Sequence, residues 1–406
     1  MKKFNKNLFN LLKKEDLSEK NSISLIPSEN IPSHLASSMY SHRAANRYLL
    51  PIDLHGKYCM PGRSTLEKLV LDLTQNLKSE YNSKKAFIKG LSGLQQMETI
   101  FLAFSEEIKD CIILDPNDGG HISTKSIAEK FKYKINYLKL NYSNWDIDYE
   151  SLQKIIDEKR NTKILIYIDH TVVLKPFNIK KLLKVIPNNW IVYYDISHLQ
   201  LFYATQTYSF PKSSNFFYGG STHKSFPGPQ KAVLFCEDGH IYEKISTAFS
   251  DTVSSYHMGS VLSLLITLEE MKTFGKSYSK QILKNSKRLA LNLSKNFDVV
   301  GPKPDFTKTH QICIDVKDSI QATEDLSKIS IITVPMRIPG RNKYGLRLGV
   351  QEITRLGMKE KEMDKLSEII TTCLTAKPTN QLNNKVRNMA SGFTKINYCF
   401  KGDDTK

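Results

Sequence analysis

The stretch that decides the fold is Gly219-Gly220-Ser221-Thr222-His223-Lys224, a turn of small and polar residues that ends in a lysine. Upstream of it, the apolar run 190–194 ends at Asp195, in Asp195-Ile196-Ser197-His198. A lysine amine can bind an aldehyde covalently, and a carboxylate can keep a pyridine nitrogen protonated. Pyridoxal phosphate (PLP) needs both groups, so the pair predicts a PLP-dependent enzyme.

Length and composition argue for a globular chain without a membrane span. The sequence has 406 residues, of which 40% are hydrophobic, enough for one large core and a smaller second domain. No apolar run approaches the roughly 18 residues that a span requires. Near the start, Phe4, Leu8, Leu11 and Leu12 fall at helical spacing between lysines, which favours a packing arm over a membrane anchor. We expect a cytoplasmic protein.

The cysteines and the net charge favour neither a metal site nor nucleic-acid binding. The cysteines show no paired or metal-ligand spacing, so we expect reduced thiols and no metal. The formal net charge is +17, but the lysines are spread along the chain, so a solvated surface is favoured over a nucleic-acid partner. A positive field also suits an anionic cofactor and substrate. The six cysteines are Cys59, Cys111, Cys236, Cys313, Cys373 and Cys399.

Apolar strand-like runs alternate with helical patterns along the first two thirds of the chain. This alternation predicts an α/β fold, a mostly parallel seven-stranded sheet with helices on both faces. The helical windows include 95–105, 149–159 and 179–185, where apolar residues recur every three or four positions. The expected strands are 86–89, 112–114, 135–140, 164–168, 191–194, 216–218 and 232–235.

The pattern changes after about residue 260, which predicts a second, smaller α+β domain. We therefore expect an N-terminal arm (1–55), a large PLP-binding domain (56–260) and a small C-terminal domain (261–406). Beyond residue 376 there is little periodicity, so we expect a partly disordered tail. The elements expected in the small domain are helices over 261–271, 279–295 and 359–374 and strands near 312–316 and 346–350.

A phosphate-binding turn is predicted where the first strand meets the first helix of the sheet. Ser92-Gly93 opens that helix, and a hydroxyl and backbone N–H groups at a helix N-terminus suit a phosphate. Alone, the serine is more often a simple N-cap, Asp195 a turn residue and Lys224 a solvated lysine. Their joint occurrence favours a cofactor site, in which Thr222 and His223 could reach the phosphate or the ring oxygen.

Seven segments, in order over most of the chain, resemble motifs of the serine hydroxymethyltransferase family of fold-type-I PLP enzymes. Ser221-Thr222-His223-Lys224 with Gly228-Pro229 resembles the family's TTHKTLRGP. The resemblance implies that fold, PLP as cofactor, an amino acid substrate and a homodimer. The other segments resemble LIASEN (25–30), NKY with GKRYYGG (46–48 and 56–58), the SGSQAN phosphate turn (92–93), AHGGH (119–121), DMAH (195–198) and IRxGTPxxTxRG (346–355).

The resemblance implies roles for residues at matching positions. Lys224 would bind the cofactor aldehyde covalently, Asp195 would pair with the ring nitrogen, and His198 would lie beside the phenolic oxygen. Arg347 would bind the substrate carboxylate as a bidentate fork. Further implied residues are Ser92 and Gly93 at the phosphate, Ser28 and Glu29 near the substrate hydroxyl, and Tyr48 and Tyr58 in the pocket, partly across the dimer interface. Capping, ion pairing or plain packing are the alternatives for Glu29 and the tyrosines.

The chain departs from the family pattern around the active site. Asp118 stands where the family has a histidine stacked on the cofactor ring. No glutamate matches the one in YAEGYPGK that serves proton transfer and folate. Residues 250–257 replace the glycine-rich PGGQGGP loop, and Ile168-Asp169-His170-Thr171 lacks the serine of GxSAYSG. We therefore expect a substrate pair other than serine and tetrahydrofolate.

Retention of Lys224, Asp195 and Arg347 favours folate-independent, aldol-type cleavage or transfer on a β-hydroxy amino acid such as threonine, with an aldehyde as acceptor. Three alternatives stay open. They are ordinary folate-dependent hydroxymethyl transfer, another PLP reaction (decarboxylation, racemisation or transamination), and an inactive scaffold or RNA-binding relative. The last is suggested only by the charge of +17 and by Asp118.

Overall fold

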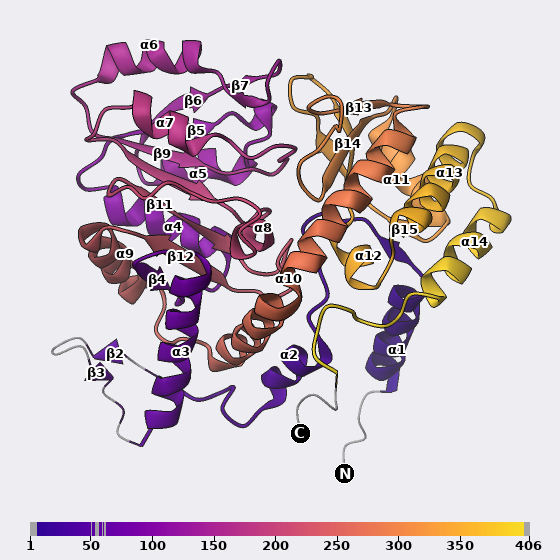
Figure 1. Cartoon of the computed structure of the whole chain (residues 1–406), viewed down its shortest axis with the longest axis horizontal. Coiled ribbons are helices and arrows are strands. Elements are labelled where there is room, and N and C mark those ends of the chain that lie inside the picture. Colours follow the sequence, from indigo (N-terminus) through magenta and orange to yellow (C-terminus); the bar gives the residue numbers. More distant parts are fainter. Residues whose placement is uncertain (1–5, 50, 53–56, 59, 61, 402–406) are drawn as a thin grey trace. The chain divides into compact units, whose positions relative to one another are not determined.

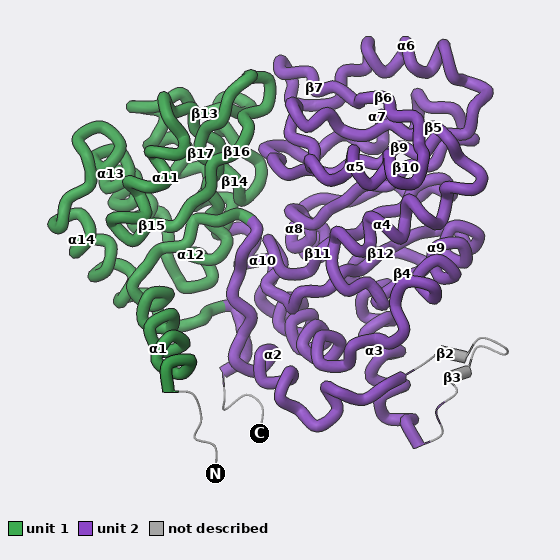
Figure 2. Tube along the Cα trace, turned by 180° about the vertical axis from the view of Figure 1, so that it is seen from behind, with its two compact units in different colours: residues 1–27, 281–397 green, residues 28–280, 398–406 purple. Residues whose placement is uncertain are grey.

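The computed structural model describes residues 6–49, 51–52, 57–58, 60 and 62–401. The chain divides into two compact units (Figure 2). The larger unit comprises residues 28–280 and 398–406, and the smaller comprises residues 1–27 and 281–397. In the described part, the cysteines other than Cys59 are all free.

The larger unit is built on a seven-stranded sheet, which confirms the predicted α/β class (Figure 1). Five neighbouring strands run parallel, and β12 lies antiparallel to both of its neighbours. All seven predicted apolar runs form strands of this sheet. In sheet order they are β4 (Lys85–Phe87), β12 (Ala232–Cys236), β11 (Phe216–Ser221), β10 (Ile191–Asp195), β9 (Ile164–Ile168), β5 (Asp110–Leu114) and β6 (Lys134–Leu138).

Helices cover both faces of this sheet. Helices α4 (Gly93–Phe104), α5 (Ile122–Lys130) and α9 (Gly239–Thr252) share one buried core with the strands. Because parallel crossovers are right-handed, α6, α7 and α8 lie on the opposite face. The remaining elements of this part of the chain are α2 (His34–Ser38), η1 (Met39–Ser41), α3 (Ser64–Glu80), η2 (Pro116–Asp118), α6 (Tyr149–Lys159), α7 (Ile179–Val185), α8 (Gln200–Ala204) and the paired strands β2 (Pro51–Ile52) with β3 (Lys57–Tyr58) and β7 (Leu140–Asn141) with β8 (Asp146–Ile147).

Helix α10 (Met258–Leu293) is one continuous helix, so the prediction of two separate helices over 261–295 was wrong. The sequence between the two predicted windows contains Gly275, which is a poor helix former. Its lack of a side chain has a packing reason, because a Cβ there would lie 2.8 Å from Cγ2 of Thr205. The helix therefore continues through Gly275, where Thr205 packs closely against its backbone.

The smaller unit contains a four-stranded antiparallel sheet and the C-terminal helices. Helix α14 (Asn380–Ser391) corrects the expectation of an aperiodic tail beyond residue 376, since Leu382, Val386 and Ala390 are buried at four-residue intervals. None of the helices that the structure describes combines the length and apolar character needed to cross a membrane. The other elements are α1 (Lys6–Lys20), β1 (Ile23–Ser24) paired with β15 (Ile331–Ile332), β13 (Asp298–Val300), β14 (Gln311–Asp315), α11 (Ser319–Lys328), β16 (Val334–Arg337), β17 (Tyr344–Gly349), α12 (Gln351–Arg355) and α13 (Glu360–Ala376).

Candidate active site

Asp195 and Lys224 meet at the carboxyl ends of two neighbouring strands. Asp195 is the last residue of β10, and it pairs in register with Gly219 of the parallel strand β11. The chain leaves β11 at Ser221 and reaches Lys224 three residues later. Burial raises the pKa of the Asp195 carboxyl, and the nearby positive charge of Lys224 opposes that rise. The edge at which strands end is where open α/β sheets bind ligands.

The turn around Asp195 is fixed by short polar contacts. The backbone N–H of Ser197 donates to Oδ1 of Asp195 at 2.8 Å, and Oγ of Ser197 accepts from the N–H of Ser221 at 2.8 Å. Gly220 has φ +141°, and a Cβ there would lie 2.4 Å from Oγ of Ser197 and 2.7 Å from Oδ1 of Asp195. Only glycine fits this position, and its lack of a side chain lets the carboxylate of Asp195 lie close to the backbone of residue 220.

The predicted phosphate turn lies against the same edge of the sheet. Ser92 is the N-cap of α4, and its Oγ accepts from the N–H of Gln95 at 3.2 Å. A Cβ on Gly93 would lie 2.5 Å from Oγ of Ser221, so the helix start abuts the end of β11. The first N–H groups of a helix have no partner within the helix. A helix start of this kind suits an anion, so the phosphate-binding role of Ser92 and Gly93 stays a prediction.

Thr222 and His223 differ in what they can offer a ligand. The hydroxyl of Thr222 donates to the carbonyl oxygen of Pro229 at 2.6 Å, within its own turn. Nδ1 of His223 is buried and has no hydrogen-bond partner in the described part of the chain. Burial, reinforced by the charge of Lys224, lowers the pKa of His223 to about 4, so the imidazole is neutral near pH 7. A neutral ring with an unused nitrogen is suited to a ligand's polar atom.

Asn30 attaches the N-terminal segment to the turn of Lys224, a contact that the sequence did not reveal. Its Nδ2 donates to the carbonyl oxygens of Lys224 at 2.9 Å and Ser225 at 3.2 Å, and lies 3.1 Å from the hydroxyl of Tyr278. These bonds bring Ser28 and the exposed Glu29 to the turn. The resemblance to LIASEN was the available signal, because it ends at this asparagine.

The other implied residues are distributed over both units. His198 is buried beyond the end of β10, and Tyr48 is 55% exposed. Arg347 lies buried on β17 in the smaller unit, where burial lowers the pKa of its guanidinium to about 10. It is therefore still charged at neutral pH. The side chain of Tyr58 lies outside what the structure describes. The roles of these residues toward cofactor and substrate stay predictions.

Asp118 makes its hydrogen bonds within the protein. One carboxylate oxygen accepts from the N–H of Leu140 at 2.9 Å, and the other accepts from the hydroxyl of Tyr142. Burial and this carboxylate together raise the pKa of Tyr142 well above its usual value. Both oxygens of Asp118 thus stabilise the segment after β6, and its expected place on the face of the cofactor ring stays a prediction.

Asp169 is a second carboxylate at this edge of the sheet, and the sequence analysis gave it no role. It follows β9, the strand beside β10, and accepts a hydrogen bond from the hydroxyl of Thr124. Burial, with a smaller contribution from the nearby Asp195, raises the pKa of Asp169 to about 7, although the hydrogen bond from Thr124 opposes the rise. A carboxylate directly after a buried strand was the signal, since Asp195 was found in the same way.

Lys231 is a fully buried lysine that sequence reasoning also missed. Its Nζ donates to the carbonyl oxygen of Tyr256 at 3.0 Å. Burial lowers the pKa of Lys231 to about 7. The hydrogen bond attaches the strand after the Lys224 turn to the segment that stands where the family has its glycine-rich loop. No sequence signal distinguishes Lys231 from the many surface lysines.

These groups fit PLP. The charge of Lys224 acts on the carboxyl of Asp195 at the strand ends and on the imidazole of His223. The predicted phosphate turn lies against the same end of β11, and Nδ1 of His223 is buried and unpartnered among the described residues. Glycines at 93 and 220 allow the close packing of the two turns, because a Cβ at either position would clash with Oγ of Ser221 or Oγ of Ser197. No group of at least three His, Cys, Asp or Glu side chains in the described ranges could hold a metal ion.

The model of the family described as serine hydroxymethyltransferase matches residues 1–370 of this chain. The chain belongs to the serine hydroxymethyltransferase family. Serine hydroxymethyltransferases use PLP, so this family member is a PLP-dependent transferase with an amino acid substrate.

Proteins named as serine hydroxymethyltransferases are similar to this chain over almost its whole length. The serine hydroxymethyltransferase of Methanobrevibacter smithii is 31% identical over 95% of this chain and 93% of the relative. That of Staphylothermus marinus is 29% identical over 94% of this chain and 90% of the relative. A crystal structure of L-threonine transaldolase from Pseudomonas fluorescens in its internal aldimine state superposes with a TM-score of 0.90, at 24% identity, over 97% of this chain and 93% of that one. That likeness establishes the fold.

Proposed function

We propose that this serine hydroxymethyltransferase relative breaks or forms the Cα–Cβ bond of a β-hydroxy amino acid such as threonine without using folate. The observation that carries the proposal is the Asp195 and Lys224 pair at the ends of β10 and β11, in a chain with no match for the family's folate-linked glutamate. When bound, PLP supplies an electron sink for the electrons of the broken bond. The similar structure of a threonine transaldolase supports transfer to an aldehyde.

The chain's own residues divide the remaining work. Asp195 keeps a proton on the ring nitrogen, and its position is fixed by the N–H of Ser197 at 2.8 Å. The guanidinium of Arg347 binds the substrate carboxylate, which orients the bond to be broken. Glu29 lies on the segment that Asn30 attaches to the turn. It acts as the general acid or base that exchanges a proton with the substrate hydroxyl.

We also propose that the active enzyme is a homodimer. Tyr48, which the resemblance assigns to a pocket shared between subunits, is 55% exposed in the single chain. Helix α1 has no buried residue, and its apolar side chains are 49% to 65% exposed. Apolar surface of this kind is typical of an interface. Association with a second copy would complete the pocket and cover the helix.

The experiment that tests the proposal measures acetaldehyde released from threonine by the PLP-loaded protein without folate. We expect release that is faster with an acceptor aldehyde and absent in Lys224→Ala. Absence of acetaldehyde, with or without the acceptor, would overturn the proposal. Glycine formation from serine only in the presence of tetrahydrofolate would instead identify an ordinary hydroxymethyltransferase, the activity for which the relatives are named.

A further inference from the structure

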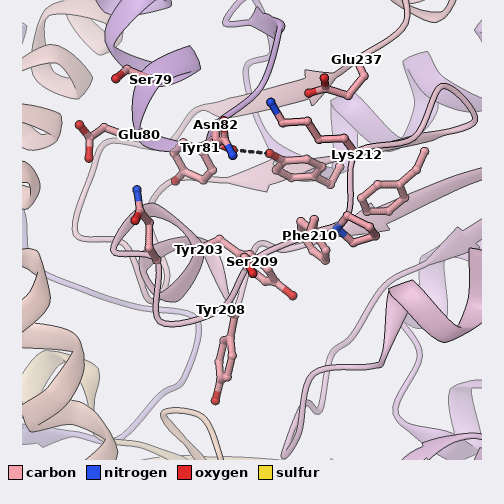
Figure 3. A pocket seen from close by; sticks show the side chains of 14 residues that line it. Ser79, Glu80, Tyr81, Asn82, Tyr203, Tyr208, Ser209, Phe210, Lys212 and Glu237 are labelled. Carbon is pink, nitrogen blue, oxygen red and sulfur yellow. Dashed lines mark hydrogen bonds between the residues drawn. The ribbon is translucent and has the colours of Figure 1, made fainter.

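A cavity lies at the end of the seven-stranded sheet where β11 begins, opposite the end that carries Asp195. Figure 3 shows the side chains that line it. Its volume is about 430 Å³, within the range of small-molecule sites. It opens at the start of β11, marked by Phe216, and at the end of β12, marked by Glu237. Lys224 follows the other end of β11, roughly 16 Å along the strand at about 3.3 Å per residue. The cavity is therefore separate from the PLP site.

The walls of this cavity are aromatic. The ring of Phe210 stacks on Tyr203 with centroids 3.9 Å apart and lies 4.6 Å from the ring of Tyr218. The hydroxyl of Tyr218 donates to the carbonyl oxygen of Tyr81 at 2.8 Å. Tyr203, by contrast, is only 6% exposed and its hydroxyl makes no hydrogen bond to any residue that the structure describes. The Tyr203 hydroxyl is therefore available to a ligand in the cavity.

Carboxylates outnumber cations in the lining, although the whole chain carries a net charge of +17. Oε1 of Glu237 accepts from the N–H of Lys84 at 3.2 Å, but its Oε2 is buried with no partner among the described residues. Burial raises the pKa of Glu80, and the nearby positive charges of Lys272 and Lys276 oppose that rise. Lys212 is the one cation in the lining, and it is exposed.

We propose that this cavity binds a small organic cation with an apolar body, independently of the PLP reaction. A buried carboxylate oxygen without a donor costs free energy that a cation would offset. Aromatic faces attract a cation as well, and the stacked rings of Tyr203 and Phe210 supply a flat surface for the apolar part. An anionic ligand would instead meet the charges of both Glu80 and Glu237.

Isothermal titration of the full-length, PLP-loaded protein with benzyltrimethylammonium tests this proposal. A quaternary ammonium cannot react with the cofactor aldehyde, so the heat measured does not come from that reaction, and the substitutions below assign the binding to the cavity. We expect saturable binding of one molecule per chain, weakened at least tenfold by Glu237→Gln and by Glu80→Gln. Neutral benzyl alcohol should bind more weakly, with an affinity that neither substitution changes. Lys212→Met should tighten cation binding, because it removes a like charge.

The glutamine variants keep the test interpretable. Glutamine at 237 retains the oxygen that accepts from the N–H of Lys84, so the local fold is preserved. Glu324→Gln, at an exposed carboxylate on α11, is the matched control and should bind as the parent does. Absence of saturable binding to the parent would overturn the proposal. Parental affinity in both Glu80→Gln and Glu237→Gln would overturn it as well.

Discussion

Asn30 is the residue that joins the N-terminal segment to the turn carrying Lys224. Asn30→Ala removes the donor to the carbonyl oxygens of Lys224 and Ser225, which should lower the free energy of unfolding by about 1–3 kcal/mol. Asn30→Asp should cost more, because it places a carboxylate against those carbonyl oxygens. Urea unfolding and PLP titration measure both effects. Asn384→Ala, at an exposed site on α14, should change neither, and parental stability of Asn30→Ala would contradict the account.

Asp169 should make stability depend on pH. The pKa of its carboxyl is about 7 in the folded chain, against roughly 3.9 in an unfolded one. The folded state therefore binds the proton more tightly, and this stabilisation is lost as the pH rises from about 4 through 7. Asp169→Asn removes that loss. The free energy of unfolding of the variant, relative to that of the parent, should therefore rise by about 1–3 kcal/mol between pH 5 and pH 8.

Urea unfolding at the two pH values measures this shift. The control Asp72→Asn, at an exposed position on α3, should leave the pH dependence of the parent unchanged. An equal stability difference between Asp169→Asn and the parent at pH 5 and pH 8 would show that the carboxyl is ionised in the fold over this whole range.

At the scale of elements, the end of β11 depends on a glycine. Gly220→Ala places a Cβ 2.4 Å from Oγ of Ser197, at a φ of +141° that side chains rarely adopt. We expect the free energy of unfolding to fall by at least about 2 kcal/mol and the affinity for PLP to fall tenfold. Gly239→Ala is the matched control, because no atom lies within 4 Å of its Cβ position at the start of α9. Equal unfolding midpoints for the two variants would refute the role given to Gly220.

The sequence predicted the seven strands of the large sheet, because each buried strand is a continuous apolar run between polar turns. It failed where tertiary contacts override local pattern. Helix α10 continues through Gly275, and β13 and β16 are too short for their periodicity to be detected. Lys224 and Asp195 could be predicted, since they belong to motifs. Asn30 and Lys231 could not be predicted from spacing, because their roles come from bonds to distant backbone carbonyls.

At the scale of the whole molecule, the exposed face of α1 predicts how copies associate. Leu11 and Leu12 are 65% and 56% exposed, and charging both with Leu11→Glu and Leu12→Glu should weaken the proposed homodimer at least tenfold. Sedimentation velocity over a range of concentrations measures this change. Ile320→Glu, at a 66% exposed site on α11, is the control and should leave association unchanged. A parent that is monomeric at every concentration would rule the dimer out.

The visible absorption spectrum of the purified chain with PLP, recorded before and after addition of threonine, tests the central claim most directly. The account predicts a cofactor band that is lost in Lys224→Ala and shifts in Asp195→Asn, and that changes in the parent when threonine is added. These results would show that the two strand ends hold PLP and present it to a β-hydroxy amino acid. A spectrum that is the same in the parent and in Lys224→Ala would contradict the assignment of this site.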